Sequence, residues 1–176
     1  MNKNKLYVII NTFFIFALGF VTHNLYNWFP NFLTILFPVN ESLYEHVKMI
    51  FLTPFITGTV LYLIFYFKGH KINNFIGSTF VSSLLNIIVF YVVFLPIYNQ
   101  IGENIVVTLI VYFISIVISQ IVNYYLINRE NNKIFNIVSL ILTFITIIIL
   151  LYYTYNPIRN DFFLDTSNNT YGIPDR

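Results

Sequence analysis

The chain has 176 residues, of which 57% are apolar, 20% are aromatic and only 9% are charged. A soluble domain of this length needs far more Lys, Arg, Asp and Glu to cover its surface, so the composition predicts an integral membrane protein. A net charge of +2 without a basic cluster excludes a typical nucleic-acid-binding protein. Because there is no cysteine, disulfides and thiolate chemistry are excluded as well.

Five apolar segments are long enough to cross a hydrocarbon layer of about 30 Å, which takes about 20 helical residues. They cover residues 6–22, 47–67, 75–98, 105–127 and 134–155. None of them alternates apolar and polar residues as the strands of a transmembrane barrel do. The predicted fold class is therefore all-α, a bundle of five transmembrane helices. Residues 1–176 form this single bundle, with an outer tail at 156–176.

The segment between the first two predicted helices, residues 24–40, is apolar but contains Pro30 and Pro38. Proline lacks a backbone donor and stops a helix, so a half-helix is expected here. The half-helix would lie in the membrane interface or re-enter the bundle, and the sequence leaves both arrangements open. Trp28 and Tyr26 suit the interface because their rings combine an apolar body with a polar edge.

Basic residues indicate how the bundle is oriented. By the positive-inside rule, the N-terminus is predicted to be cytoplasmic and the C-terminus extracytoplasmic. A basic start before an apolar core also describes a signal peptide, but the apolar stretch continues past the small residues Ala17 and Gly19, which favours a retained helix. The abundance of Ile, Asn and Phe resembles that of AT-rich bacterial genomes, so we expect a bacterial plasma membrane. Six cations lie on the predicted cytoplasmic side: Lys3, Lys5, Lys68, Lys71, Arg129 and Lys133.

Residues 41–48, at the start of the second predicted helix, concentrate two carboxylates, an imidazole and an ammonium group in a chain that otherwise avoids charge. Ser42 and Glu45 have the spacing of a capping box, which would satisfy free backbone donors without any chemistry. On a helix Glu41, Glu45 and Lys48 share one stripe, so Lys48 could pair with both acids. Caps and ion pairs are thus one complete explanation of this run.

His46 points about 100° away from that stripe, so the second helix alone makes a poor metal site. His23 supplies a second element, because it lies at the same membrane level near the end of the first helix. Two imidazoles with Glu41 and Glu45 form a ligand set that Zn, Mn or Fe accepts. We therefore predict Glu41, Glu45, His46 and His23 as catalytic candidates, and His23, His46 and Glu41 as candidate ligands of a divalent metal.

Other residues near this level are candidates for substrate binding. The tail contributes Asp161 and Asp165, which could fold back over the predicted site. Three explanations remain open: a metal or acid/base site, a polar ligand pocket without metal, and structural caps with ion pairs. The predicted substrate-binding residues are Trp28, Tyr26, Tyr44, Lys48 and Asp165.

Residues 38–48, Pro-Val-Asn-Glu-Ser-Leu-Tyr-Glu-His-Val-Lys, resemble the signature of an uncharacterised family of small bacterial membrane proteins known only as a domain of unknown function. The stretch 23–28 is similar to a His-x-x-Tyr-acid-Trp element of that family, although Asn27 replaces the acid. Residues 165–172 resemble its tail, which ends in Tyr-Gly, although Thr166 and Asn169 replace Pro and Gly. The resemblance covers the whole chain and implies no known reaction.

Two functional hypotheses follow. The first is a membrane-embedded enzyme that acts on a lipid or lipid-linked substrate at the outer face through the His/Glu site. The second is a module that binds or transports a small cationic or zwitterionic solute, with aromatic rings contributing cation–π attraction. A five-helix bundle without internal repeats would transport most naturally as a homo-oligomer or beside a partner membrane subunit. Membrane lipids are expected partners in either case, and nucleic acid is not.

Overall fold

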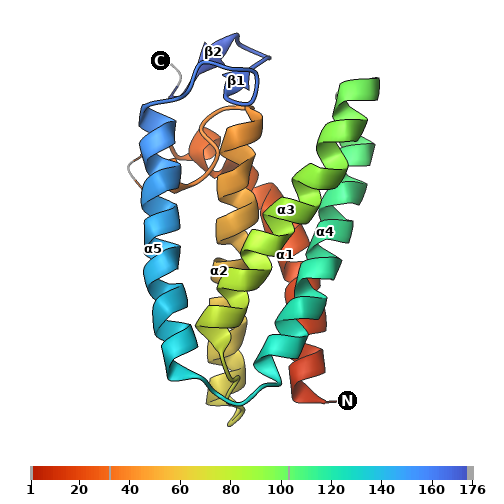
Figure 1. The fold of residues 1–176 in the computed structure, drawn as a ribbon, viewed down its shortest axis with the longest axis vertical. Coiled ribbons are helices and arrows are strands. Elements are labelled where there is room, and N and C mark those ends of the chain that lie inside the picture. Colours follow the sequence, from red (N-terminus) through yellow and green to blue (C-terminus); the bar gives the residue numbers. More distant parts are fainter. Residues whose placement is uncertain (1, 32, 103, 174–176) are drawn as a thin grey trace.

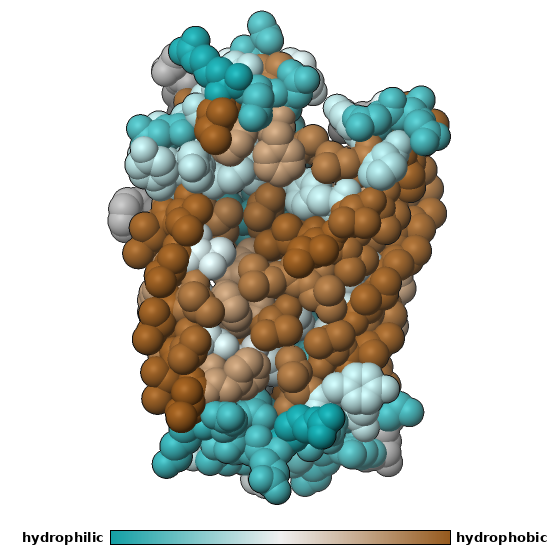
Figure 2. Space-filling model, viewed as in Figure 1, coloured by the Kyte–Doolittle hydropathy of each residue, from teal (hydrophilic) through white to brown (hydrophobic). Residues whose placement is uncertain are grey.

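In a computed structural model of the chain, which describes residues 2–31, 33–102 and 104–173, five long helices form one bundle (Figure 1). Each has 23–27 residues and is apolar enough to cross a membrane, so the protein is a multi-pass membrane protein and the predicted fold class is confirmed. Figure 2 shows a broad apolar belt between two hydrophilic ends. The helices are α1 (Lys3–Trp28), α2 (Leu43–Phe67), α3 (Phe75–Ile101), α4 (Ile105–Ile127) and α5 (Lys133–Tyr155).

The helices do not run parallel to one another throughout their length. Near the end that carries the tail, α3 and α4 lean away from α2, while α1 leans toward α2 (Figure 1). Helices α1 and α4 come close at Gly19, where an added Cβ would lie 2.9 Å from the Tyr112 hydroxyl oxygen. Beyond this crossing, α3 and α4 diverge from α1 and α2 (Figure 1).

Neutral polar side chains link the helices in the middle of the bundle. Asn11 of α1 and Asn123 of α4 both donate to the amide oxygen of Gln120, over 3.2 Å and 2.9 Å. All three side chains are buried. Such hydrogen bonds between or within helices stabilise a bundle in lipid by about 1 kcal/mol each.

The connection between α1 and α2 differs from the expected half-helix. Helix α1 continues to Trp28, six residues beyond the predicted end, because no proline interrupts it and the Phe29 N–H still donates to the Leu25 carbonyl over 3.0 Å. Pro30 then ends the helix, since it has no N–H to continue the pattern. The rest of the segment holds only one short turn of 3₁₀-helix, η1 (Thr34–Leu36).

The tail folds back over the start of α2. Its two short strands, β1 (Leu164–Asp165) and β2 (Thr170–Tyr171), form an antiparallel hairpin in which Leu164 pairs with Tyr171. Asn169 in the turn has a φ of 54°, the left-handed conformation that a glycine adopts most easily.

Hydrogen bonds attach the tail to the segment before α2 and to the start of α2. The Asn40 amide donates to the Gly172 carbonyl over 2.7 Å, and the Tyr44 N–H donates to the Phe162 carbonyl over 2.9 Å. The Tyr44 ring also stacks on Phe163, with 4.2 Å between the ring centroids. The tail is therefore part of the folded structure up to residue 173, and residues 174–176 lie outside the described part.

Candidate metal centre

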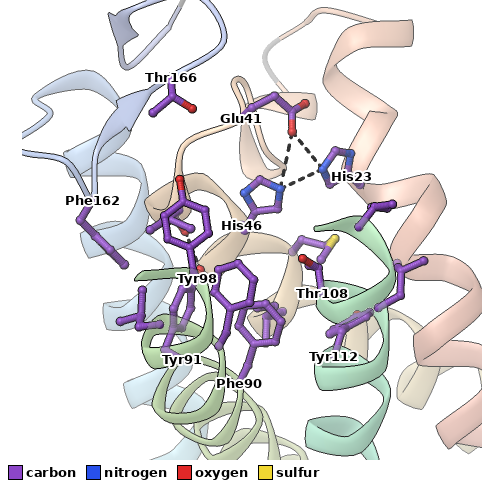
Figure 3. Close-up of a pocket in the computed structure, with 18 of the residues that line it drawn as sticks. His23, Glu41, His46, Phe90, Tyr91, Tyr98, Thr108, Tyr112, Phe162 and Thr166 are labelled. Atoms are coloured by element: carbon purple, nitrogen blue, oxygen red, sulfur yellow. Dashed lines mark hydrogen bonds and ion pairs between the residues drawn. The ribbon is translucent and has the colours of Figure 1, made fainter. Parts of the chain in front are cut away.

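Three side chains from separate parts of the chain converge at the tail end of the bundle (Figure 3). The Nε2 atoms of His23 in α1 and His46 in α2 lie 2.9 Å apart. The Glu41 Oε2 atom lies 3.3 Å from His23 Nε2 and 3.7 Å from His46 Nε2. The sequence had placed both histidines at one level, and the structure brings their side chains into direct contact.

Glu41 reaches the histidines because it is not part of the helix. Ser42 is the N-cap of α2, and its hydroxyl accepts a hydrogen bond from the Glu45 N–H over 3.3 Å. Helix spacing therefore begins only at Leu43, and the expected stripe of Glu41 with Glu45 and Lys48 does not form. Only half of the expected capping box forms. The Ser42 hydroxyl accepts from the Glu45 N–H, but the Glu45 carboxylate accepts from the Val39 N–H instead of the Ser42 N–H.

Hydrogen bonds around the cluster fix the orientation of its members. His46 Nδ1 lies 2.7 Å from the Ser42 carbonyl oxygen, which can only accept, so Nδ1 carries a proton. In the neutral imidazole this leaves the Nε2 lone pair free and directed at His23 and Glu41. A backbone carbonyl that holds the remote nitrogen in this way is the usual support of a metal-binding histidine.

The carboxylates at the site are stabilised in their charged forms. The hydrogen bond with His23 lowers the pKa of Glu41 from its ordinary value of 4.5, an effect that outweighs partial burial. Burial alone would raise the pKa of Asp165, but hydrogen bonds from Ser167 and from the Glu41 backbone lower it overall. The Glu41 N–H donates to Asp165 Oδ2 over 3.3 Å, so the tail also positions the backbone of the glutamate.

The three donor atoms fit a tetrahedral metal ion. Metal–nitrogen and metal–oxygen bonds of about 2.0–2.1 Å place neighbouring ligands about 3.3 Å apart. The observed separations of 2.9, 3.3 and 3.7 Å lie on both sides of that value. Shifts of a few tenths of an ångström would equalise them. His23, Glu41 and His46 supply three ligands, which is the number that catalytic zinc sites use, with a fourth position left for water.

The cluster borders a cavity of about 790 Å³ in the space between the diverging helices. The end of the cavity nearest the tail, called the mouth below, is lined by polar side chains, including His23, Glu41 and Thr166 (Figure 3). The deeper wall is apolar and aromatic, with side chains from α2, α3 and α4 (Figure 3). A cavity of this size is within the range of small-molecule sites, about 300–1,000 Å³.

A family model for a family of unknown function, DUF6512, matches residues 1–173. The chain belongs to this family. No curated protein and no solved structure matches the chain. Membership agrees with the uncharacterised family expected from residues 23–48 and 165–172, whereas the signature itself and the bacterial origin stay predictions.

Two of the predicted catalytic and binding residues in this DUF6512 protein form a separate group. Glu45 and Lys48 are each 1% exposed and pair with each other. Thr154 of α5 completes the group, since it accepts from Lys48 Nζ over 2.9 Å and donates to the Glu45 carboxylate over 2.8 Å. This buried ion pair joins α2 to α5 and is not part of the cavity wall.

The remaining predicted binding residues also lie outside the wall. Tyr44 is buried under the tail and donates to the Leu150 carbonyl over 2.8 Å. Tyr26 is buried, and Trp28 is exposed at the end of α1. Asp165 acts on the site through Glu41. The third histidine, His70, contacts Asn4 over 2.7 Å at the opposite end of the bundle.

Sequence reasoning missed the aromatic wall of the cavity. Phe90, Phe94 and Tyr98 follow one another every four residues along α3, so they share a face, and Tyr91 and Tyr112 join them in the wall. The four-residue spacing was visible in the sequence. It was not informative there, because aromatic residues occur throughout this chain and the same spacing also describes a packed or lipid-facing helix.

Proposed function

We propose that the protein is a divalent-metal enzyme that acts on an amphiphilic, lipid-like substrate at the outer face of the membrane. The observation that carries this proposal is the convergence of His23 Nε2, His46 Nε2 and Glu41 Oε2 within 4.8 Å at the edge of a large cavity. Zinc is the metal that best suits two imidazoles and one carboxylate with an open fourth position.

The donor set supports hydrolysis. A metal ion held by these residues would lower the pKa of a bound water to about 7 and so supply hydroxide at neutral pH. The water oxygen would bond to the carbon or phosphorus of an ester, the ester bond to the leaving oxygen would break, and a water proton would end on that oxygen. His46 is held by Ser42, and Glu41 by Asp165, so the ligands keep their orientation during this exchange.

The composition of the cavity supports an amphiphile. Polar groups gather at the mouth, whereas Phe90, Phe94 and Ile50 line the apolar part of the wall. A substrate with a polar head and an apolar body matches both regions at once. The predicted orientation of the helices places this mouth on the extracytoplasmic side.

The test is metal content in the purified protein. We expect about one zinc per chain in the wild type, as in sites with a complete ligand set. His46→Ala and Glu41→Gln should lose most of it. The matched controls are His70→Ala and Glu130→Gln, which remove the same groups at the opposite end of the bundle and should keep the metal. Equal metal in all four variants, or none in the wild type, would overturn the proposal.

A second candidate is binding or transport of a small cationic or zwitterionic solute. One observation favours it: the described wall combines several aromatic rings with Glu41 and Asp161 and holds no Lys or Arg. Aromatic faces and carboxylates together attract quaternary ammonium groups. A metal-free protein whose melting temperature rises with choline, and not with zinc, would favour this candidate over the enzyme.

A further inference from the structure

The cavity lies between helices that diverge toward the tail end. Its walls come from both α1, through Phe20, and α4, through Ile105 and Leu109. These two helices touch at Gly19 and Tyr112 and separate toward the tail end. The cavity therefore lies in a wedge whose narrow end is this crossing, inside the membrane-spanning part of the helices.

A second space lies next to this wedge on the lipid-facing side. It has a volume of about 350 Å³, and all of its lining side chains are apolar. Val106, Ile110 and Ile114 are about half exposed, as expected for residues that face lipid. The lining residues are Phe16, Val106, Leu109, Ile110, Phe113 and Ile114.

Partly buried Leu109 lines both spaces, so the cavity and the second space, called the groove below, adjoin at this side chain. Below it, Phe16 packs edge-on against Phe113, with 5.2 Å between centroids, and also contacts the Tyr112 ring. These rings pack α1 against α4, so a route from the groove into the cavity would pass Leu109, which lines both.

We propose that an apolar chain of a membrane lipid enters the cavity from the bilayer between α1 and α4, past Leu109, with its polar head at the His23–Glu41–His46 cluster. The role of the lipid head rests on the proposed function. The position of the apolar chain follows from the cavity and the groove alone. A lipid in a bilayer has its head at the boundary and its chain in the core. The polar mouth and the apolar groove are arranged in the same order.

Burial of a chain in this wedge replaces contact with loosely packed lipid by contact with fixed aromatic side chains, which provides close dispersion contacts. A water-soluble ligand would instead leave the deep wall, including Met49 and Phe94, in contact with water. Contact between this apolar wall and water is unfavourable, by about 25 cal/mol per Å² of apolar surface. The wedge therefore favours an apolar occupant.

The experiment uses tryptophan fluorescence, because the chain has only one tryptophan, Trp28. In a Trp28→Phe background, Met49→Trp places the probe in the deep wall of the cavity. Leu109→Trp places it where the cavity adjoins the groove. Each protein is reconstituted in phosphatidylcholine vesicles with acyl chains brominated near their middle, and iodide is the water-soluble quencher. Reference probes are Val92→Trp, on the lipid face, and Arg159→Trp, on the exposed tail.

We expect brominated chains to quench Met49→Trp and Leu109→Trp to an extent comparable with Val92→Trp, and iodide to quench only Arg159→Trp. Quenching of Met49→Trp by iodide, or by neither agent, would overturn the inference. If Met49→Trp does not fold, Phe94→Trp, a buried side chain of the same cavity wall that does not line the groove, decides by the same criteria. Metal content is measured on the same samples, so a metal-loaded protein without lipid quenching contradicts only the lipid route. Absence of metal contradicts only the proposed chemistry.

Discussion

The buried ion pair between Glu45 and Lys48 gives the sharpest stability prediction. Both side chains are 1% exposed, and Lys48 also donates to the Ile35 carbonyl over 2.9 Å. Lys48→Met keeps most of the length of the side chain but leaves the Glu45 carboxylate buried with only the Val39 N–H and the Thr154 hydroxyl as donors. Loss of one partner of a buried pair costs about 3–5 kcal/mol.

This cost can be measured as a fall in thermal stability in detergent. For a chain of this size, 1 kcal/mol corresponds to about 2–4 °C in the melting temperature, so Lys48→Met should lower it by about 6–20 °C. The double variant Glu45→Gln with Lys48→Met removes both charges and should recover much of the loss, since replacement of a whole buried pair is often close to neutral. A loss below about 1 kcal/mol, typical of exposed pairs, would refute the assignment of this pair as buried and structural.

Three further predictions concern the site and the packing around it. Metal retention should fall as the pH drops, because protons compete with the metal for the histidine nitrogens. The pKa of Glu41 is lowered from its ordinary value of 4.5, so its contribution is complete above that pH and is lost only on stronger acidification. Dialysis at stepped pH, followed by metal analysis, would contradict this if retention changed only below pH 4.5. Asp165→Ala removes acceptors of the Glu41 and Ser167 N–H groups, at a cost of about 1–3 kcal/mol, and should expose the tail to limited proteolysis, whereas Asp161→Ala should not. Gly77→Ala places a methyl group against the Phe135 ring and should destabilise the α3–α5 contact by about 1–3 kcal/mol, more than Gly58→Ala does in the same melting assay.

Much of the architecture was predictable from the sequence because lipid imposes one strong requirement. A chain in hydrocarbon must satisfy its own backbone hydrogen bonds, so length and apolarity alone identify the five helices. The ends of the helices were less predictable. Helix α1 runs to Trp28 because nothing before Pro30 interrupts its backbone hydrogen bonds, and no local signal at residue 22 marks an end.

Three members of the candidate cluster, His23, Glu41 and His46, were predictable from the sequence, whereas the separate position of Glu45 and the geometry of the cluster were not. His23 and His46 could be placed at one level by counting helical rise, which depends only on regular structure. The position of Glu41 could not, because Ser42 ends the helical spacing and the tail, more than 120 residues away in sequence, holds the Glu41 backbone through Asp165. The surroundings of Lys48 could not be predicted either, because its partner Thr154 lies at the end of the last helix.

X-ray absorption spectroscopy at the zinc edge tests the central claim most directly, because it reports which atoms surround the metal. For the wild type we expect two imidazole nitrogens and a carboxylate oxygen at about 2.0–2.1 Å, with one light atom from water. The His46→Ala protein should show one imidazole fewer, or no bound zinc. Zinc without imidazole ligands in the wild type, or the same spectrum in the variant, would contradict a metal centre at His23, Glu41 and His46.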